Sequence, residues 1–228
     1  MQETDNTQKL DIGNLVIYKN NQFIALNKPA GVGVQPGKTT EKSLLDLAEI
    51  YTHSKLRVIH RIDQPATGVV LFAKNDKALA ALNQQFQDRA ISKKYLAVVG
   101  QLPPEKEGTL EHFLIKNSKL NKSFIAKDAS QKNAKKAVLS YKLIGSSERY
   151  HLLEIDLQTG RHHQIRAQLS AIGCPIKGDV KYGFRRGNKD RSIHLHAWKL
   201  NFKHPVSEEQ ITLIAESPND PVWNALRE

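Results

Sequence analysis

The order of strand-like and helix-like segments limits the fold of this chain more than any other feature of its sequence. Short β-forming runs lie at residues 16–18, 23–26, 69–73, 95–99, 153–157, 194–200 and 211–215. Helical spacing of apolar residues occurs at 44–51, 79–86 and 165–172, and Asn219-Asp220-Pro221 resembles the start of a short C-terminal helix. Because the two types do not alternate strictly, the pattern predicts an α+β fold with a mixed, mostly antiparallel sheet flanked by helices and loops, rather than a doubly wound parallel sheet.

Composition excludes several classes of protein. The 228 residues include 34 Lys and Arg against 23 Asp and Glu, a net charge of +11. A single cysteine, Cys174, excludes a disulfide framework and a cysteine-rich zinc site. No apolar run approaches the ~20 residues of a spanning helix, and the polar N-terminus lacks a signal-peptide pattern. We therefore expect a cytoplasmic protein that does not engage membranes, with residues 1–12 as a flexible tail and one domain over residues 13–228.

Two stretches hold much of the positive charge. Residues 113–149 carry nine Lys and Arg against two acidic residues, and residues 177–191 carry six against two. Both stretches contain Gly, Asn and Ser and have weak periodicity, so they are predicted to be loops or ribbon-like excursions. Solubilising charge is the alternative for either stretch alone, but two of them around a motif-dense segment favour a nucleic-acid-binding face. The candidate binding residues in these stretches are Lys132, Lys135, Lys136, Arg185 and Arg186.

The polar segment His60-Arg61-Ile62-Asp63 precedes a turn and the buried strand predicted at residues 69–73. A carboxylate beside an Arg at the mouth of a sheet can act as a nucleophile or a base, because the neighbouring cation keeps it ionised at neutral pH. A structural Asp–Arg pair on a loop is the alternative. The loop at residues 27–36 has two Pro and two Gly but lacks the spacing of a phosphate-binding loop, so it is predicted to be a structural turn.

The segment Gln-Thr-Gly-Arg-His-His-Gln-Ile-Arg, which ends in Arg166, opens the third predicted helix. The pattern predicts that His162, His163 and Gln164 lie in the first turn, where free N–H groups attract anions. Arg166 lies at the edge of the apolar stripe, a position that suits an Arg held half-buried against a carboxylate. A solvated helix face is the alternative.

Histidines also raise the question of a metal site. His194 and His196 share a face of a predicted strand, and His162 and His163 could join them. No HExxH motif, cysteine pair or acidic residue at ligand spacing accompanies them, which argues against a metal. A Ser-His-Asp triad is also unsupported, because no G-x-S-x-G elbow occurs.

Taken together and in order, these segments resemble the RluA family of RNA pseudouridine synthases. The similar segments are His60-Arg61-Ile62-Asp63 with Thr67-Gly68 and Ala73-Lys74, and residues 27–36, 94–100, 159–166, 173–183 and 195–197. The resemblance runs from about residue 13 to residue 225. The sequence departs from the family pattern at Ala66-Thr67, where the family has Thr-Ser, and at Cys174, where it has His. Neither departure touches the Asp, Tyr or Arg positions of the motifs.

The resemblance implies the pseudouridine synthase fold. It also implies an enzyme that breaks the N-glycosidic bond of a uridine, turns the base and rejoins it through carbon, with no cofactor and no metal. Asp63 would be the catalytic carboxylate, which attacks the ribose C1′ or removes a ribose proton. Arg166 would pair with Asp63. Tyr95 would stack on the uracil and could share in the proton step at C5, and Arg61 would occupy or stabilise the gap left by the flipped uridine.

The expected partner is a structured rRNA or tRNA stem-loop, because flipping a uridine costs least in a single-stranded loop. His60 and Arg161 are expected to contact this RNA together with the basic residues named above. The family's N-terminal S4 RNA-binding domain is expected to be absent, and a monomer is expected. One alternative is a non-catalytic RNA-binding protein on the same fold, against which the intact Asp63, Tyr95 and Arg166 set argues. The other is a metal-dependent hydrolase built on the histidines.

Overall fold

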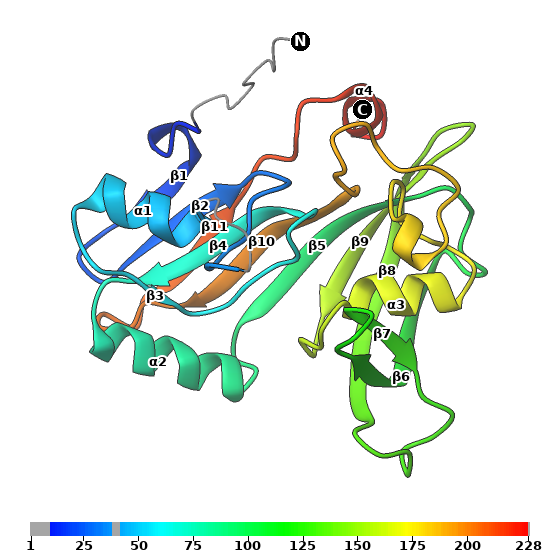
Figure 1. Ribbon diagram of the computed structural model, residues 1–228, viewed down its shortest axis with the longest axis horizontal. Helices are drawn as coiled ribbons and strands as arrows, with labels where there is room; N and C mark the ends of the chain where they lie inside the picture. The colour runs from blue at the N-terminus through cyan, green and yellow to red at the C-terminus, as the bar shows by residue number, and fades with distance from the viewer. Residues whose placement is uncertain (1–9, 38–41, 228) are drawn as a thin grey trace.

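Figure 1 shows the computed structural model, which describes residues 10–37 and 42–227. Its strands are β1 (Val16–Lys19), β2 (Phe23–Lys28), β3 (Arg57–Val58), β4 (Thr67–Ala73), β5 (Ser92–Val99), β6 (Glu107–Asn117), β7 (Lys122–Ile125), β8 (Lys135–Ser146), β9 (His151–Leu157), β10 (Leu195–Lys203) and β11 (Gln210–Ile214). Its helices are α1 (Leu44–Thr52), α2 (Asp76–Gln87), α3 (Gln164–Ala171) and α4 (Pro221–Ala225), with 3-10 turns η1 (Gly13–Leu15) and η2 (Val180–Tyr182). Each strand and helix predicted from the sequence corresponds to one of these elements.

The strands of the described residues form one sheet whose centre is assembled from distant parts of the chain. The main path runs β1-β2-β4-β10-β5-β9-β8-β6-β7, with β11 added to β10 and β3 added to β4. β10 pairs in parallel with β4, and the other neighbouring strands are antiparallel. The predicted α+β class with a mixed, mostly antiparallel sheet is therefore confirmed.

The half of the sheet around β2 and β4 is buried on both faces. Ile24 of β2 packs in one core with Leu44 of α1, and Phe23 packs in another with Leu82 of α2. Since successive side chains of a strand point to opposite faces, α1 and α2 cover opposite faces of this half. Every residue of β4 is buried as a consequence, which explains its uninterrupted apolar sequence.

The helix starts follow from local sequence. Ser43 and Asp46 form a capping box at α1, in which the side chain of each accepts from the backbone N–H of the other. Asn75 caps α2 by accepting from the N–H of Ala78, and Asp220 caps α4 immediately before its first-turn proline. These caps satisfy backbone donors that would otherwise lack partners at the start of each helix.

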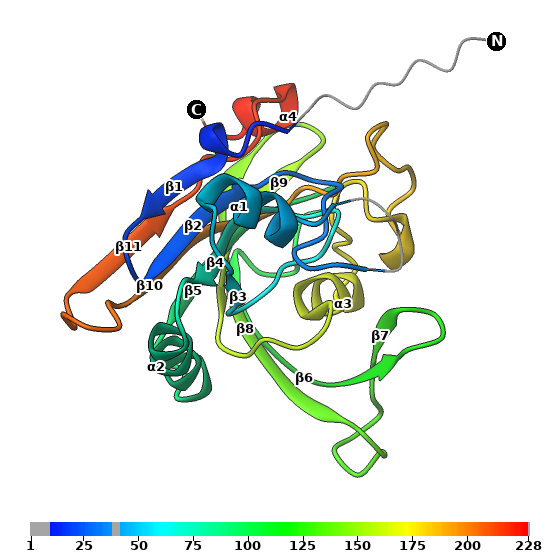
Figure 2. The same ribbon diagram turned by 60° about the vertical axis from the view of Figure 1, so that its left-hand side comes forward.

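The other half of the sheet is covered by α3 and α4. Ile165 and Leu169 of α3 belong to the core on one face of β5, β9 and β8, whereas Trp223 of α4 packs with Leu96 and Leu152 on the opposite face. β6, β7 and β8 continue beyond this core as a ribbon, which Figures 1 and 2 show projecting past α3. Residues 113–149, predicted as loops or ribbon-like excursions, are thus mostly strand. Its far residues are largely exposed, so the apolar alternation that marks a strand is weak there.

The N-terminal tail predicted over residues 1–12 lies outside the described residues as far as position 9. The rest of it joins the fold, because Ile12 is buried and Leu10 packs against the same core as α1. Burial of these two apolar side chains stabilises the start of the folded region before residue 13. Within residues 10–37 and 42–227, no helix is long and apolar enough to cross a membrane.

The two halves of the sheet meet where β4 runs beside β10, and Gly68 permits this contact. Its φ is +115°, and a Cβ at this position would lie 2.2 Å from the carbonyl oxygen and 2.6 Å from the nitrogen of Ala197. Next to it, the Thr67 hydroxyl forms a hydrogen bond of 2.7 Å with Nδ1 of His196. The close approach of the two backbones therefore requires glycine at position 68.

Gly68→Ala should lower the free energy of unfolding by about 3 kcal/mol or more, because the added methyl group would force β4 away from β10. Gly173→Ala is the matched control, since Gly173 also has a positive φ, +78°, but has nothing within 4 Å of an added Cβ. Its loss should be limited to the backbone cost of about 1–2 kcal/mol. Urea unfolding measures both variants, and equal losses would contradict the steric explanation.

Candidate active site

A cleft of about 260 Å³ lies where the two halves of the sheet meet. The loop before β4 lines one part of it, and α3 with the residues before α3 lines another. β5, the end of β9, Phe86 of α2 and Leu195 of β10 complete the lining. Of the eleven residues predicted to be catalytic or to bind RNA, five lie outside this lining, all of them predicted RNA-binding residues: Lys132, Lys135, Lys136, Arg185 and Arg186. The other six line it together: His60, Arg61, Asp63, Tyr95, Arg161 and Arg166.

Arg166 links two carboxylates across this cleft. Its Nη1 donates to Oδ2 of Asp63 at 2.9 Å, so the contact expected from the sequence is present. The same guanidinium donates twice to Asp179, from Nε to Oδ2 at 2.6 Å and from Nη2 to Oδ1 at 2.9 Å. The side chain of Asp179 is 1% exposed and that of Asp63 is 24% exposed. Asp179 therefore holds the guanidinium while Asp63 stays accessible from the cleft.

The two carboxylates offset the burial of Arg166. Burial alone would lower the pKa of the guanidinium, but the hydrogen bonds and charge of Asp179, followed by the charge of Asp63, raise that pKa above its ordinary value. Arg166 is a permanent cation as a result. It fixes the orientation of the Asp63 carboxylate, whose ionised form can attack carbon or accept a proton.

Lys28, the last residue of β2, supports the loop that carries Asp63. Its buried ammonium donates to three carbonyl oxygens, those of Pro29 at 2.7 Å, Val32 at 2.9 Å and Gln64 at 3.0 Å. Burial lowers the pKa of Lys28 to about 7, although the charge of Asp63 acts to raise it. The segment predicted as a structural turn thus anchors the residue next to Asp63. Sequence spacing carries no signal for this contact.

The start of α3 differs from the prediction. Gln164 is the first helical residue, and His163 precedes it with a left-handed backbone, φ 52°. The placement of His162 and His163 in the first turn was therefore wrong. The chain turns at His163 because the Gln164 side chain reaches back and accepts from the Thr159 hydroxyl at 2.7 Å and the Arg161 N–H at 3.0 Å.

The His163 ring lies beside the carboxylate of Asp63, with Nε2 3.7 Å from Oδ2. Its Nδ1 is 3.0 Å from the hydroxyl of Tyr182. Burial lowers the pKa of His163 to about 3, although Asp63 acts to raise it. The ring is therefore neutral near pH 7 and adds no charge to the site.

Tyr95 lines the cleft from β5, and His60 lines it from the loop before β4. Burial, and secondly the charge of Asp63, raise the pKa of Tyr95 well above its ordinary value, so its phenol is protonated at neutral pH. Nε2 of His60 accepts from the N–H of Leu71 at 3.1 Å, and burial lowers the pKa of His60 to about 4. Any contact between His60 and RNA near pH 7 would thus involve an uncharged imidazole.

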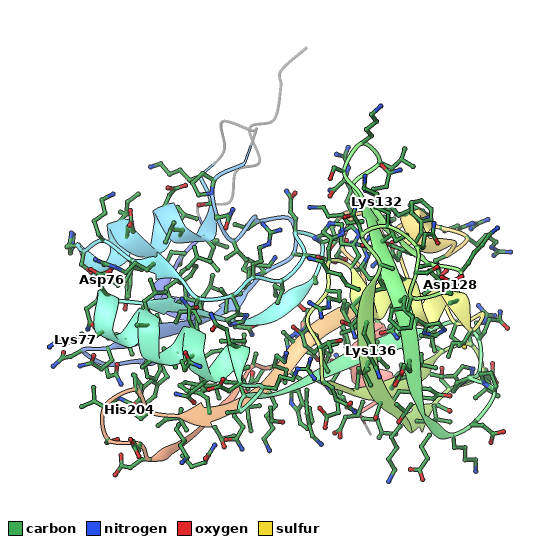
Figure 3. All side chains as sticks on the ribbon, turned by 90° about the horizontal axis from the view of Figure 1, so that it is seen from below. Asp76, Lys77, Asp128, Lys132, Lys136 and His204 are labelled. Carbon is green, nitrogen blue, oxygen red and sulfur yellow. The ribbon has the colours of Figure 1, made fainter. Side chains whose placement is uncertain are left out.

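The predicted basic residues outside the cleft differ in their surroundings. Lys136 pairs with Glu111 at 2.7 Å across the β6–β8 ladder, and its carbonyl accepts from Nε of Arg161 at 3.0 Å. Lys132 precedes β8 on the opposite side of the molecule from α2 (Figure 3). All five of these basic residues are exposed, including the remaining three: Lys135, Arg185 and Arg186.

The histidines considered as metal ligands are engaged in other contacts. Nδ1 of His196 bonds to the Thr67 hydroxyl, and its Nε2 lies 3.0 Å from the carbonyl oxygen of Ala215. Nδ1 of His162 lies 2.9 Å from the Ser123 hydroxyl. In the part of the chain that the structure describes, no three His, Cys, Asp or Glu residues gather as a metal-binding group.

Arg166→Met should lower the free energy of unfolding by about 3–5 kcal/mol, because Asp179 would remain buried without its partner. Asp63→Asn should cost far less, since Asp63 is partly exposed. The Arg166→Met/Asp179→Asn double variant should lose less stability than the two single variants summed. A denaturant-unfolding cycle over these proteins measures the coupling, and strict additivity would contradict a direct contact.

The sequence is similar to those of several known proteins. Residues 22–171 match the model of a family described as RNA pseudouridylate synthase. The chain is 32% identical over 228 residues to the ribosomal large subunit pseudouridine synthase D of Zymomonas mobilis, a match that covers 92% of this chain and 71% of the relative. It is 33% identical over 228 residues to the tRNA pseudouridine synthase C of Haemophilus ducreyi, covering 88% and 89% of the two proteins.

The fold is shared as well. The solved structure of human RNA pseudouridylate synthase domain containing 4 matches with a TM-score of 0.76 and 25% identity, over 91% of this chain and 90% of that one. The family match includes the loop of Asp63, the strand of Tyr95 and the helix of Arg166. The chain therefore belongs to the RNA pseudouridylate synthase family and is an isomerase.

Proposed function

We propose that this enzyme converts a uridine in a structured cytoplasmic rRNA or tRNA to pseudouridine, with Asp63 as the catalytic carboxylate. The observation that carries the proposal is the accessible Asp63 carboxylate, held by buried Arg166 in a cleft of about 260 Å³. This volume is just below the ~300–1,000 Å³ that is typical of small-ligand sites, and it suits a single flipped nucleoside. The names of the relatives, one acting on ribosomal RNA and one on tRNA, support both RNA classes.

The proposed reaction breaks the bond from ribose C1′ to uracil N1 and forms a bond from C1′ to C5. Ionised Asp63 attacks C1′ and displaces N1, and C5 of the turned base then displaces Asp63 from C1′. Alternatively, Asp63 removes a ribose proton as N1 leaves, giving a glycal, and returns that proton when C5 bonds to C1′. After the base has turned and bonded through C5, C5 loses its proton and N1 gains one. Substrate and product are isomers, so the atoms balance without an external reagent. Arg166 keeps its charge throughout and orients Asp63.

Tyr95 is proposed to stack on the uracil. Because the raised pKa keeps its phenol protonated, Tyr95 can donate a hydrogen bond or relay a proton but cannot begin the reaction as a base. Arg61, which is exposed at the cleft, is proposed to occupy the space that the flipped uridine leaves in the RNA. Flipping costs a few kcal/mol, which is least in a single-stranded loop.

Further basic residues are proposed to bind RNA phosphates and set affinity without entering the chemistry. A larger cleft of about 670 Å³, lined in part by Arg61, Arg161 and Lys181, adjoins the first. His60 is proposed to contact the nucleoside through its neutral ring. Since one chain supplies every proposed group, we propose that a monomer is active. The more distant RNA-binding residues are proposed to be Lys132, Lys135, Lys136, Arg185 and Arg186.

Asp63→Asn should abolish pseudouridine formation while RNA binding and folding remain nearly intact. The amide keeps the shape of the side chain but is neither a nucleophile nor a useful base, so the rate should fall by orders of magnitude. Tritium release from RNA labelled at uridine C5 measures turnover. Asp76→Asn is the control, because Asp76 is an exposed residue outside the cleft. Near-normal release by Asp63→Asn would contradict its catalytic role, and no release by the wild type would favour a non-catalytic RNA-binding protein.

Tyr95→Phe and Tyr95→Ala should separate stacking from proton transfer. Phe keeps the ring and hence a stacking energy of about 1–3 kcal/mol per base, whereas Ala loses both the ring and the hydroxyl. Single-turnover rates and RNA affinities are measured for both variants. We expect Phe to bind RNA more tightly than Ala, because its ring remains in the cleft. Equal RNA affinities for the two variants would contradict a stacking role.

A further inference from the structure

We propose that a second cleft beside the active site binds the RNA phosphate next to the target uridine, and that Lys93 is its central cation. This cleft has a volume of about 390 Å³ and lies between the C-terminal end of α2 and the loop that joins β9 to α3. The inference rests on the proposed function, since the nucleoside in the active-site cleft defines which phosphate is meant. It concerns two residues, Lys93 and Arg89, to which the reaction gives no role.

The lining of this second cleft suits an anion. It contains three cationic side chains, Arg89, Lys93 and Arg161, and no carboxylate. Side-chain amides that can donate hydrogen bonds also line it: Asn83, Gln87 and Gln158. Arg guanidinium groups match the geometry of phosphate oxygens, and Lys supplies a compact point charge.

Lys93 connects this cleft to the active site. It lies two residues before Tyr95 on β5, so both side chains point to the same face of the strand. Lys93 lines both cavities. Its ammonium nitrogen is 3.9 Å from the position that a Cβ on Gly160 would occupy, which puts the charge against the backbone of the loop before α3.

The charge of Lys93 is not paired within the described residues. No ion pair there involves Lys93 or Arg89. Burial lowers the pKa of Lys93, Asp156 acts to raise it, and Arg89 lowers it further. A half-buried cation beside a second cation is electrostatically unfavourable, and a phosphate between them would relieve both charges.

The position of Arg161 suggests a path for the RNA through three neighbouring clefts. Arg161 lines the active-site cleft, this second cleft and the larger cleft that also contains Arg61 and Lys181. A nucleotide bound in the active-site cleft has one phosphate on each side of its ribose. One flanking phosphate would lie with Lys93 and Arg89, and the strand would continue on the other side past Lys181.

The test replaces the phosphate and the lysine separately and together. A synthetic stem-loop carries the uridine that the enzyme is found to modify, and a neutral methylphosphonate replaces the phosphate on its 5′ side or on its 3′ side. For the wild type, one of the two replacements should weaken binding about tenfold. Lys93→Met should weaken binding of unmodified RNA by a similar factor, but should add no further loss on that methylphosphonate. The slope of log K against log[salt] should also flatten by about 0.7–0.9.

Two further variants keep the test decisive. Arg89→Met removes an exposed side chain and should show the same coupling if Lys93→Met folds poorly. Lys203→Met, which changes an exposed lysine on β10 outside these clefts, should lose equally little affinity for all three RNAs.

Independent losses of affinity from the Lys93→Met variant and the methylphosphonate would overturn the phosphate site. If Lys93→Met slowed the single-turnover rate but left RNA affinity unchanged, Lys93 would act on the uracil, and the phosphate site would again be overturned. If the wild type modified no uridine, both the proposed function and this site would fail, whereas absent coupling in an active enzyme would remove the phosphate site alone.

Discussion

The bidentate contact between Arg166 and Asp179 is the constraint on which the site depends. It lets an Arg be buried in α3 with two of its nitrogens satisfied, so that a third can face Asp63. Asp63 lies 103 residues before Arg166, and Asp179 lies 13 residues after it. One guanidinium therefore ties together the loop before β4, the helix α3 and the turn before η2. The two carboxylates satisfy the positive charge of the guanidinium, which makes burial of Arg166 tolerable.

The sequence predicted the parts of the fold whose patterns are local. The start of α4 at Asp220 and the apolar run of β4 are decided within a few positions, so the pattern alone was enough. The ribbon of β6 to β8 was less clear because its far end buries little apolar surface. The pairing of Asp63 with Arg166 came from a family resemblance, since residues so distant in sequence have no spacing signal.

The rest of the site depended on tertiary context. The three hydrogen bonds of Lys28 involve carbonyl oxygens, which every residue possesses, so no motif distinguishes the residues it contacts. The left-handed backbone of His163 was missed because residues other than glycine have that conformation in only a few per cent of cases, and no local pattern marks it here. The partner of Lys136, Glu111, lies on a neighbouring strand, and only the register of β6 with β8 brings them together.

The position of β10 has a consequence for the order in which the molecule is assembled. β10 lies between β4 and β5 in the sheet, yet it follows β5 by about a hundred residues in the chain. A growing polypeptide therefore cannot join its two halves until this late strand leaves the ribosome and inserts between the two earlier ones. Such long-range pairing slows folding, because a large loop must close before the contacts form. Asp63 and Tyr95, synthesised early, acquire their final geometry only after β10 has been made, so activity toward RNA is delayed until translation has passed residue 203.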